Sequence, residues 1–255
     1  MNAAAIGLAS GTQVAVEVVA ETGSTNADLL ARAPALAGPT LLIAEHQSAG
    51  RGRAGRSWLS APGDSLTFSL AWKFDLPLQQ LAGLPLAVGV ALAEALAACG
   101  VQVQLKWPND MLKDGSKLAG VLIETQAASG GGIWAIIGVG MNLRMPDDLE
   151  QRIGRSVAAA PWLAQMDRDA LMAALLASLA RTLAEFRQSR FRAFSARWNR
   201  LHAWQGRLVS ILDNGAVLHE GTAAGVDDEG RLLLDCAEGR ITVLAGDVSL
   251  RTREA

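Results

Sequence analysis

A loop of alternating glycines and arginines contains the residue types in this sequence that are best suited to chemistry. The segment Gly50-Arg51-Gly52-Arg53-Ala54-Gly55-Arg56-Ser57-Trp58 has three arginines and three glycines in its first seven residues. Glycine lets backbone N–H groups approach a ligand closely, and the arginine guanidinium is a planar fork of donors that matches phosphate or carboxylate. We therefore predict that this segment, the arginine loop, binds a small anion and becomes ordered around it.

Two other interpretations of the arginine loop stay open at this point. A solvated basic loop would have the same composition, and so would a loop that contacts nucleic-acid phosphates without reading a sequence. The segment is not a nucleotide P-loop, because no Lys-Ser or Lys-Thr follows its glycines. It also lacks the strand-turn-helix setting of the dinucleotide-binding fingerprint.

A second polar cluster is the segment Lys106-Trp107-Pro108-Asn109-Asp110. The residues before it, 101–106, alternate between apolar and polar, which predicts a half-buried strand that ends at this turn. A Pro-Asn-Asp turn alone is ordinary turn chemistry. Here, however, it holds an ammonium and a carboxylate close together at a strand end, where functional sites often lie.

Lysine is scarce in this chain and is concentrated near that turn. Of the 23 lysines and arginines, only Lys73, Lys106, Lys113 and Lys117 are lysines, and the last three lie within twelve residues. Chance would explain this in so small a set. The alternative is that a compact ammonium is needed there, which a guanidinium cannot replace.

Three further motifs lie at the ends of predicted elements. Gly23-Ser24-Thr25-Asn26 precedes a predicted helix, where Ser24 or Thr25 can cap the first turn and the free N–H groups can also bind a polar ligand group. Lys117-Leu118-Ala119-Gly120 opens a predicted strand, and Gly138-Val139-Gly140-Met141-Asn142 ends another. Glycines at a strand end permit a close approach of ligand to backbone, although this signal is weak by itself.

Composition limits the class of protein. The chain has 255 residues, half of them hydrophobic, which is enough for one large and one small domain. Its net charge of -2 argues against a general nucleic-acid or membrane-surface binder. Cys99 and Cys236 are far apart and indicate neither a disulfide framework nor a metal site, so a reducing, cytoplasmic environment is expected.

Periodicity predicts an ordered series of elements. The longest apolar run, residues 84–98, is too short to span a bilayer and predicts a buried central helix. From Gly206 onward, short strands alternate with glycine-containing turns, which predicts a small β-barrel and a domain boundary near that residue. The other predicted strands are residues 14–19, 40–45, 65–72, 121–124 and 133–139, and the other predicted helices are 27–32, 167–186 and 191–204.

Taken in order along the chain, these motifs resemble those of biotin protein ligases, in the form that lacks an N-terminal DNA-binding domain. The arginine loop and the Lys-Trp-Pro-Asn-Asp turn together are highly specific for that family. The resemblance implies an α+β fold, in which a mixed β-sheet packed with helices, like the catalytic domain of class II synthetases, is followed by a small SH3-like β-barrel. It places a catalytic biotin- and ATP-binding domain at residues 1–205 and the barrel at 206–255.

The resemblance also implies a reaction in two steps. The biotin carboxylate attacks the α-phosphate of ATP to give biotinyl-AMP and pyrophosphate, and a lysine of a biotin carboxyl carrier domain then displaces AMP. Both reactants of the first step are anions, so the site must supply positive charge and N–H donors, with Mg²⁺ on the ATP and no metal ligands assigned in the protein. The mixed anhydride must be shielded from water, which suits a loop that closes over it.

Roles for individual residues follow from the same resemblance. Lys117 is expected to bridge the carboxylate and α-phosphate oxygens, Arg53 to close the loop over the adenylate, and Asp110 to hold Lys117 or guide the acceptor amine. The residues expected to bind biotin are Ser24, Thr25, Asn26, Gln47, Gly50, Arg51, Gly52, Arg53, Lys117 and Gly120, and those expected on the ATP side are Arg56, Trp58, Lys106, Asn109 and Asn142.

Further expectations concern partners. About twenty residues precede the first predicted helix, too few for a helix-turn-helix domain, so we expect no specific DNA binding. No membrane association is expected, because the longest apolar run is too short to span a bilayer. A cytoplasmic monomer or homodimer is expected. The nearest rival activity is a lipoate or octanoate ligase or transferase, and rivals of other classes are a binding module for biotin or nucleotide without turnover and, with less support, a nucleic-acid binder.

Overall fold

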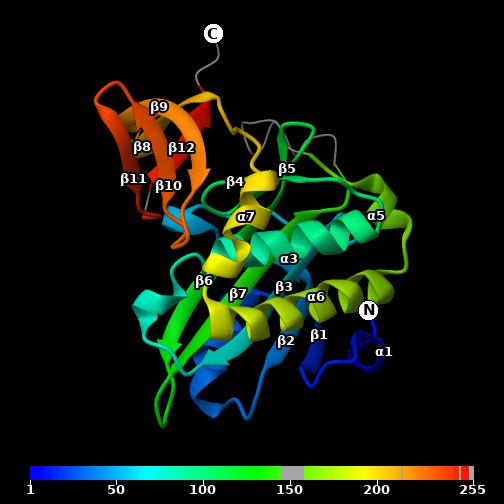
Figure 1. The fold of residues 1–255 in the computed structure, drawn as a ribbon. Coiled ribbons are helices and arrows are strands. Elements are labelled where there is room, and N and C mark those ends of the chain that lie inside the picture. The colour runs from blue at the N-terminus through cyan, green and yellow to red at the C-terminus, as the bar shows by residue number, and fades with distance from the viewer. Residues whose placement is uncertain (145–157, 214, 247, 253–255) are drawn as a thin grey trace.

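The chain folds into a large mixed β-sheet with helices on both faces, followed by a smaller antiparallel sheet (Figure 1). This arrangement is taken from a computed structural model, which describes residues 1–144, 158–213, 215–246 and 248–252. The large sheet with its helices and the small sheet after them confirm the predicted α+β class. The small sheet stands beyond the β4 and β5 end of the large one (Figure 1).

The large sheet has seven strands and a mixed topology. Only the pair at one edge, β1 with β2, is parallel, and all the other neighbours are antiparallel. The order across the sheet is β1-β2-β3-β7-β6-β5-β4. The strands are β1 (Ala15–Thr22), β2 (Thr40–Gln47), β3 (Ser65–Phe74), β4 (Gln104–Lys106), β5 (Asp110–Lys113), β6 (Ser116–Ala127) and β7 (Ile133–Asn142).

Helices cover the two faces of this sheet unequally. They are α1 (Ala3–Ser10), α2 (Thr25–Arg32), α3 (Leu84–Ala98), α5 (Pro161–Gln165), α6 (Arg168–Ser189) and α7 (Arg192–Arg200). On one face α3 packs against β4, β5 and β6, and α6 and α7 pack on α3 (Figure 1). On the other face α2 is the only helix among the described residues that packs, against β2, β3, β6 and β7. The described helices therefore leave part of that second face open.

The pleat of the strands separates an apolar face from a face with small and polar residues. In β7, Ile137, Val139 and Met141 are buried in the main core, whereas the alternate positions Gly138 and Gly140 point to the α2 face. In β3, Phe68 and Leu70 are likewise in the main core, while Ser69 turns to the α2 face, where it bonds to α2. A recess can therefore form beside α2 without opening the core.

Most of the predicted helices are observed, with caps that explain their ends. Ser24, one of the two predicted caps, caps α2, and Asp167 caps α6. The apolar α3 is buried between the sheet and α6, also as predicted, although by length and composition residues 78–98 would pass as a membrane span. The prediction that the first helix begins after about twenty residues was wrong: α1 starts at Ala3, with the Asn2 side chain accepting from the N–H of Ala5.

The small sheet follows α7 and has five antiparallel strands in the order β11-β10-β9-β8-β12. Its buried residues, such as Val209, Ile211, Leu232 and Leu234, belong to the same apolar cluster as the core of the large sheet. The domain boundary near Gly206 therefore stays a prediction, and parts of both predicted domains lie outside the described residues. The strands are β8 (Leu208–Asp213), β9 (Ala216–Val226), β10 (Leu232–Cys236), β11 (Gly239–Val243) and β12 (Val248–Thr252).

Candidate functional site

A pocket lies on the α2 face of the large sheet, and most of the residues singled out in the sequence line it. It is bounded by the turn before α2, the arginine loop, the Lys-Trp-Pro-Asn-Asp turn, strands β6 and β7, and strand β12 of the small sheet. The predicted site residues among its lining are Ser24, Thr25, Asn26, Gln47, Arg51, Gly52, Arg53, Arg56, Trp58, Lys106, Asn109, Asp110, Lys117 and Gly120.

Two predicted residues do not line this pocket. Gly50 lies at the base of the arginine loop, where a Cβ would come within 2.4 Å of the carbonyl oxygen of Trp58. Asn142 is buried, and its amide donates to the carbonyl of Ala158 at 3.2 Å. Both residues have structural contacts in the chain itself, and their predicted ligand roles stay predictions.

The floor of the pocket is a row of residues that pair directly across neighbouring strands. Gly140 of β7 pairs with Gly120 of β6, Gly120 with Asp110 of β5, and Asp110 with Lys106 of β4. The Trp58 indole fills the space that a side chain at position 140 would need. It lies over β7, and a Cβ on Gly140 would come within 2.2 Å of it. The two glycines thus make room for a ring and a ligand at the sheet surface.

Lys117 reaches this row because β6 contains a β-bulge. The pairing of β5 with β6 shifts between Met111 and Leu112, so that Met111 pairs with Ala119 but Leu112 pairs with Lys117. Leu118 and Ala119 are consequently both buried in the main core. A bulge reverses the alternation of side chains, which turns Lys117 to the pocket face instead of the core.

Positive charge dominates the pocket. Among the residues that the structure describes, its lining contains six cationic side chains and one carboxylate, which is Asp110. That carboxylate forms an ion pair with Lys117 through Oδ1 and lies 3.8 Å from Lys106 Nζ through Oδ2. Arg51 also pairs with Glu124, which lies outside the lining, but two carboxylates cannot neutralise six cations, so an anionic ligand is favoured electrostatically. The cations are Arg51, Arg53, Arg56, Lys106, Lys117 and Arg251.

Aromatic rings place the two lysines. The ammonium of Lys106 lies 4.6 Å from the centroid of the Trp204 ring, and that of Lys117 lies 5.7 Å from the Trp58 ring. Both distances are within the range of a cation–π interaction. Trp204 comes from the segment between α7 and the small sheet, so the position of Lys106 depends on how the two sheets are joined.

The arginine loop is a short hairpin in this structure. Arg51 and Ser57 form a β-bridge, the N–H of Gly52 donates to the Arg56 carbonyl at 2.6 Å, and the N–H of Trp58 donates to the Gly50 carbonyl at 2.9 Å. The turn of this hairpin, Arg53–Gly55, crosses the pocket. Its backbone is therefore already organised by its own hydrogen bonds.

Arg53 ties the tip of the loop to two other parts of the chain. Its Nη1 donates to Asn109 Oδ1 at 3.1 Å, and its Nη2 donates to the Gly246 carbonyl next to β12. Asn109 is itself fixed, because its amide donates to the Val121 carbonyl at 2.7 Å. One guanidinium thus joins the loop, the Lys-Trp-Pro-Asn-Asp turn and the small sheet.

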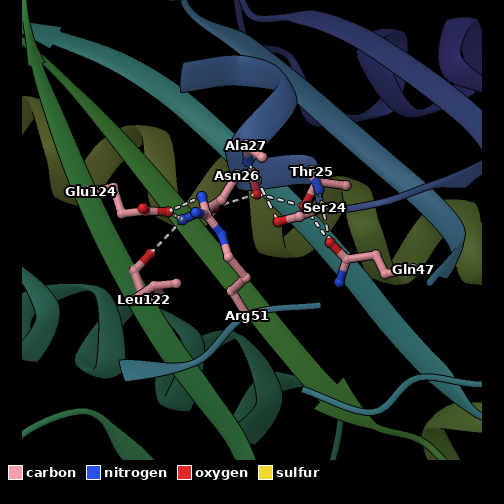
Figure 2. A network of polar contacts seen from close by, with 9 residues as sticks. Ser24, Thr25, Asn26, Ala27, Gln47, Arg51, Leu122 and Glu124 are labelled. Carbon is pink, nitrogen blue, oxygen red and sulfur yellow. Dashed lines mark hydrogen bonds and ion pairs between the residues drawn. The ribbon is translucent and has the colours of Figure 1, made fainter. Parts of the chain in front are cut away.

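A network of polar side chains borders the pocket at the start of α2 (Figure 2). The Ser24 hydroxyl accepts from the N–H of Ala27 at 3.4 Å, which caps the helix. Gln47 Oε1 accepts from the N–H of Thr25 at 2.8 Å and from its hydroxyl at 3.1 Å. The capping and ligand-binding interpretations of this turn are therefore compatible, since the same residues line the pocket.

The network extends from Thr25 to the arginine loop. The Thr25 and Ser69 hydroxyls are 2.6 Å apart, and the Ser69 hydroxyl donates to Asn26 Oδ1 at 2.6 Å. The amide nitrogen of Asn26 donates to Glu124 Oε2 at 2.8 Å, and Arg51 Nη2 donates to the same oxygen at 2.9 Å (Figure 2).

Several residues of the site were not predicted from the sequence. Ser69 and Glu124 both belong to the network. Each lies on the pocket face of its strand, an even number of positions from another residue of that strand that faces the pocket. Strand alternation would have found them once that face was known. Strand β12 also lines the pocket through residues 248–251, and no local feature of the sequence indicates this contact.

Comparison with known proteins gives a consistent result. Residues 17–142 match the Biotin/lipoate A/B protein ligase family, and residues 206–251 match the Biotin protein ligase C terminal domain. The bifunctional ligase/repressor BirA of Escherichia coli is 35% identical over 98% of this chain and 77% of its own length. A biotin–acetyl-CoA-carboxylase ligase of Mycobacterium tuberculosis is 35% identical over 95% of this chain and 91% of its own.

Solved structures agree with the sequence relatives. The structure of a biotin protein ligase from Aquifex aeolicus in complex with biotin and ATP superposes with a TM-score of 0.78 at 27% identity. The match covers 93% of this chain and 99% of the other. Both sheets are therefore part of the shared fold.

Proposed function

The chain belongs to the biotin protein ligase family, and we propose that the pocket beside α2 is where it activates biotin with ATP and from which it transfers biotin to a carrier lysine. It is an ATP-dependent ligase, as the sequence motifs predicted. The observation that supports this use of the pocket is its charge: of the residues described there, six cationic side chains and a single carboxylate line it. Such a lining suits a reaction between two anions.

In the first step, an oxygen of the biotin carboxylate attacks the α-phosphorus of ATP, and the bond from that phosphorus to the bridging oxygen breaks. The products are biotinyl-AMP and pyrophosphate. Lys117 contacts both the carboxylate and the α-phosphate oxygens in this proposal, which is supported by the position of its Nζ beside Gly120, 3.0 Å from where a Cβ on that glycine would lie. A compact ammonium there stabilises the negative charge that builds up between the two reactants.

In the second step, a neutral amine of the acceptor lysine attacks the acyl carbon of biotinyl-AMP. The amide bond forms, the bond to the phosphate oxygen breaks, and AMP leaves while the amine loses a proton. Asp110 pairs with Lys117 and Lys106, and we propose that it orients Lys117 in the first step and guides the acceptor amine in the second. Arg53, which ties the loop across the pocket, keeps water from the mixed anhydride between the steps.

The two ends of the pocket suit the two substrates. The hydroxyl and amide groups of Ser24, Thr25, Asn26 and Gln47 are donors and acceptors for the biotin head group. Gly52 and Arg51 of the loop border that end. The other end is lined by Arg56, Trp58, Lys106 and Asn109, which we assign to the nucleotide.

Magnesium fits this site as a partner of ATP. Asp110 is the one carboxylate in the pocket lining and is paired with two lysines, and the described residues contain no group of three or more His, Cys, Asp or Glu suited to a metal. The ion would therefore be held chiefly by phosphate oxygens, where it neutralises the charge of the leaving pyrophosphate.

The acceptor and the setting are also proposals. The acceptor is a lysine of a biotin carboxyl carrier domain, in keeping with the carboxylase that the name of the Mycobacterium tuberculosis relative mentions. The protein is expected to work in the cytoplasm as a monomer or a homodimer. Two domains, residues 1–205 and 206–255, would share the pocket, with the second contributing β12.

The deciding experiment uses purified protein, Mg²⁺ and ATP with either biotin or octanoate and without acceptor, followed by mass spectrometry of the small molecules. Biotinyl-AMP without octanoyl-AMP is expected. Octanoyl-AMP alone would refute the choice of biotin, which matters because the matching family also includes lipoate ligases. No adenylate from either acid, in protein shown to be folded, would refute catalysis and favour a binding module.

A further inference from the structure

Glu124 is a polar residue of the site for which the proposed reaction has no use. It lies on β6, on the same face as Gly120 and Leu122, and its side chain is 26% exposed. Its Oε2 oxygen accepts two hydrogen bonds, one from Arg51 Nη2 and one from Asn26 Nδ2. Figure 2 shows these two donors converging on the one carboxylate from the arginine loop and from α2.

The charge of Glu124 fixes which way the Asn26 amide faces. A carboxylate only accepts hydrogen bonds, and so does the Leu122 carbonyl, which lies 3.4 Å from the same amide nitrogen. The NH₂ group of Asn26 must therefore face β6, and its Oδ1 must face Ser69. An uncharged Gln at position 124 would also offer donors, which would allow the Asn26 amide to turn over.

The direction of the whole hydrogen-bond chain follows from that orientation. Because Asn26 Oδ1 is an acceptor, the single hydroxyl hydrogen of Ser69 is donated to it. Ser69 must then accept from Thr25 at 2.6 Å, so that the hydroxyl hydrogen of Thr25 is shared between Ser69 and Gln47 Oε1. Glu124 thus sets the donors and acceptors of Asn26, Ser69 and Thr25, whereas Gln47 Oε1 is held as an acceptor by the backbone N–H of Thr25.

The same carboxylate also anchors the arginine loop. Arg51 is the second residue of that loop, and its ion pair with Glu124 joins the base of the hairpin to the floor of the sheet, where Trp58 also lies over Gly140. Arg53 ties the tip of the loop to other segments. Because Arg51 and Glu124 are both partly exposed, their ion pair contributes little to the free energy of unfolding. Its effect is on where the loop lies.

We propose that Glu124 is a positioning residue, which holds the base of the arginine loop through Arg51 and sets the direction of the hydrogen bonds from Asn26 through Ser69 to Thr25. The effect on biotin binding rests on the proposed function, whereas the effect on the loop does not. Glu124 touches neither substrate in this role. It links loop order and head-group recognition through one oxygen atom.

The test uses Glu124→Gln, Arg51→Gln and the double variant, with Glu17→Gln as the matched control. Glu17 also lies on a strand and pairs with an arginine, Arg32, at 2.6 Å, but outside the pocket. The first measurement is the rate of trypsin cleavage after Arg53 and Arg56 in protein without ligand. The second is the KM for biotin and kcat in carrier biotinylation.

Glu124→Gln is expected to speed cleavage of the loop and to raise the KM for biotin, each by about three- to tenfold, the effect of losing one charge-assisted bond at a partly exposed position. The value of kcat should stay within about twofold of wild type, since no reacting atom is touched. In the Arg51→Gln background, Glu124→Gln should leave cleavage unchanged and still raise the KM, because the route through Asn26 remains.

Cleavage and KM values no different from those of Glu17→Gln would overturn the proposal. Arg51→Gln tests the anchor from the loop side without changing the sheet, so the conclusion survives even if Glu124→Gln fails to fold. A wild-type protein that makes no biotinyl-AMP would refute the proposed function instead. The cleavage rates of the ligand-free variants would then still decide whether Glu124 holds the loop.

Discussion

The ammonium of Lys117 forms an ion pair with the carboxylate of Asp110 across two neighbouring strands. The bulge in β6 makes this pair possible, because a regular strand would turn Lys117 toward the core. Asp110 is also within 3.8 Å of Lys106. The carboxylate of Asp110 therefore holds the Lys117 ammonium in the pocket, but its single negative charge cannot neutralise the positive charges of both lysines.

Replacing Lys117 with Ala should abolish adenylate formation while the fold is kept. The side chain is on the pocket face and is not part of the main apolar core, so its removal should leave the packing of that core intact. Loss of one group that stabilises transition-state charge typically costs 10²- to 10³-fold in rate, and we expect at least about that loss here. Pyrophosphate release with saturating biotin and ATP measures it.

Lys113→Ala is the matched control for that variant. Lys113 lies on the same hairpin and pairs with the exposed Asp114, and it does not line the pocket. Its loss should leave the rate within about twofold, as expected for a surface pair. Near-normal turnover by Lys117→Ala would remove Lys117 from its central role.

Arg53→Gly should give an active enzyme that releases its intermediate. The substitution removes both the bond to Asn109 and the bond to the Gly246 carbonyl, so the tip of the loop loses its ties while Lys117 is untouched. Biotinyl-AMP should appear free in solution, about tenfold or more above wild type, the effect of losing two hydrogen bonds from a charged group. Ultrafiltration followed by mass spectrometry detects it.

Arg207→Gly, at an exposed position before β8, is the control for an arginine lost elsewhere. It should retain the intermediate as wild type does. Equal amounts of released adenylate from wild type and Arg53→Gly would argue that the loop does not close the pocket.

Local signals in the sequence predicted the parts of the site but not all of their connections. Ser24 could be identified as a cap from its place before a helix, and Lys106 and Asp110 could be grouped because one short turn holds both. Lys117 was recognised by its motif. Its orientation was not predictable, because the bulge that sets it results from the pairing of β5 with β6.

The contacts that were missed join residues far apart in the chain. Asn26 and Glu124 are 98 positions apart, and Arg53 and Gly246 are 193 apart. Periodicity describes one element at a time and does not indicate which faces meet, so neither contact could be predicted. Helix α1 was missed for a different reason: its cap Asn2 and its terminal Gly11, with φ of 62°, are visible signals, but the helix is short and weakly amphipathic.

Gly140→Ala should impair catalysis more than folding. Its Cβ would come within 2.2 Å of the Trp58 indole, which belongs to a loop and can move, so the ring would be displaced from the pocket floor. The KM for ATP should rise by about tenfold or more, because Trp58 is assigned to the nucleotide side. The ammonium of Lys117 would also lose its cation–π contact with the Trp58 ring. The melting temperature should change by only a few degrees.

Two comparisons make this prediction specific. Gly38→Ala adds a methyl group where nothing lies within 4 Å and should be silent. In a Trp58→Ala background, Gly140→Ala should add little, because the residue that it displaces is already gone. Additive effects of the two substitutions would show that Gly140 is needed for another reason.

Protonation of His202 should destabilise the fold as the pH falls. Burial lowers the pKa of His202, and the bond of its Nδ1 to Gln205 at 3.2 Å opposes that shift only in part. The unfolded chain, with an ordinary histidine pKa near 6.5, therefore binds more protons than the native state at mildly acidic pH. Stability is full above about pH 6.5 and is lost as the pH falls from there through the lower native pKa.

His202→Gln should flatten that dependence, whatever it does to stability at neutral pH, because the group that titrates is gone. Urea midpoints at about pH 7.5 and about pH 5.5 measure the slope, with the exposed His219→Gln as the control that keeps the wild-type slope. His202 stacks on Trp198 at 4.7 Å and precedes the segment that carries Trp204. Parallel pH curves for wild type and His202→Gln would mean that acid destabilises the fold through other groups, and that the junction between the two sheets tolerates a charge at this position.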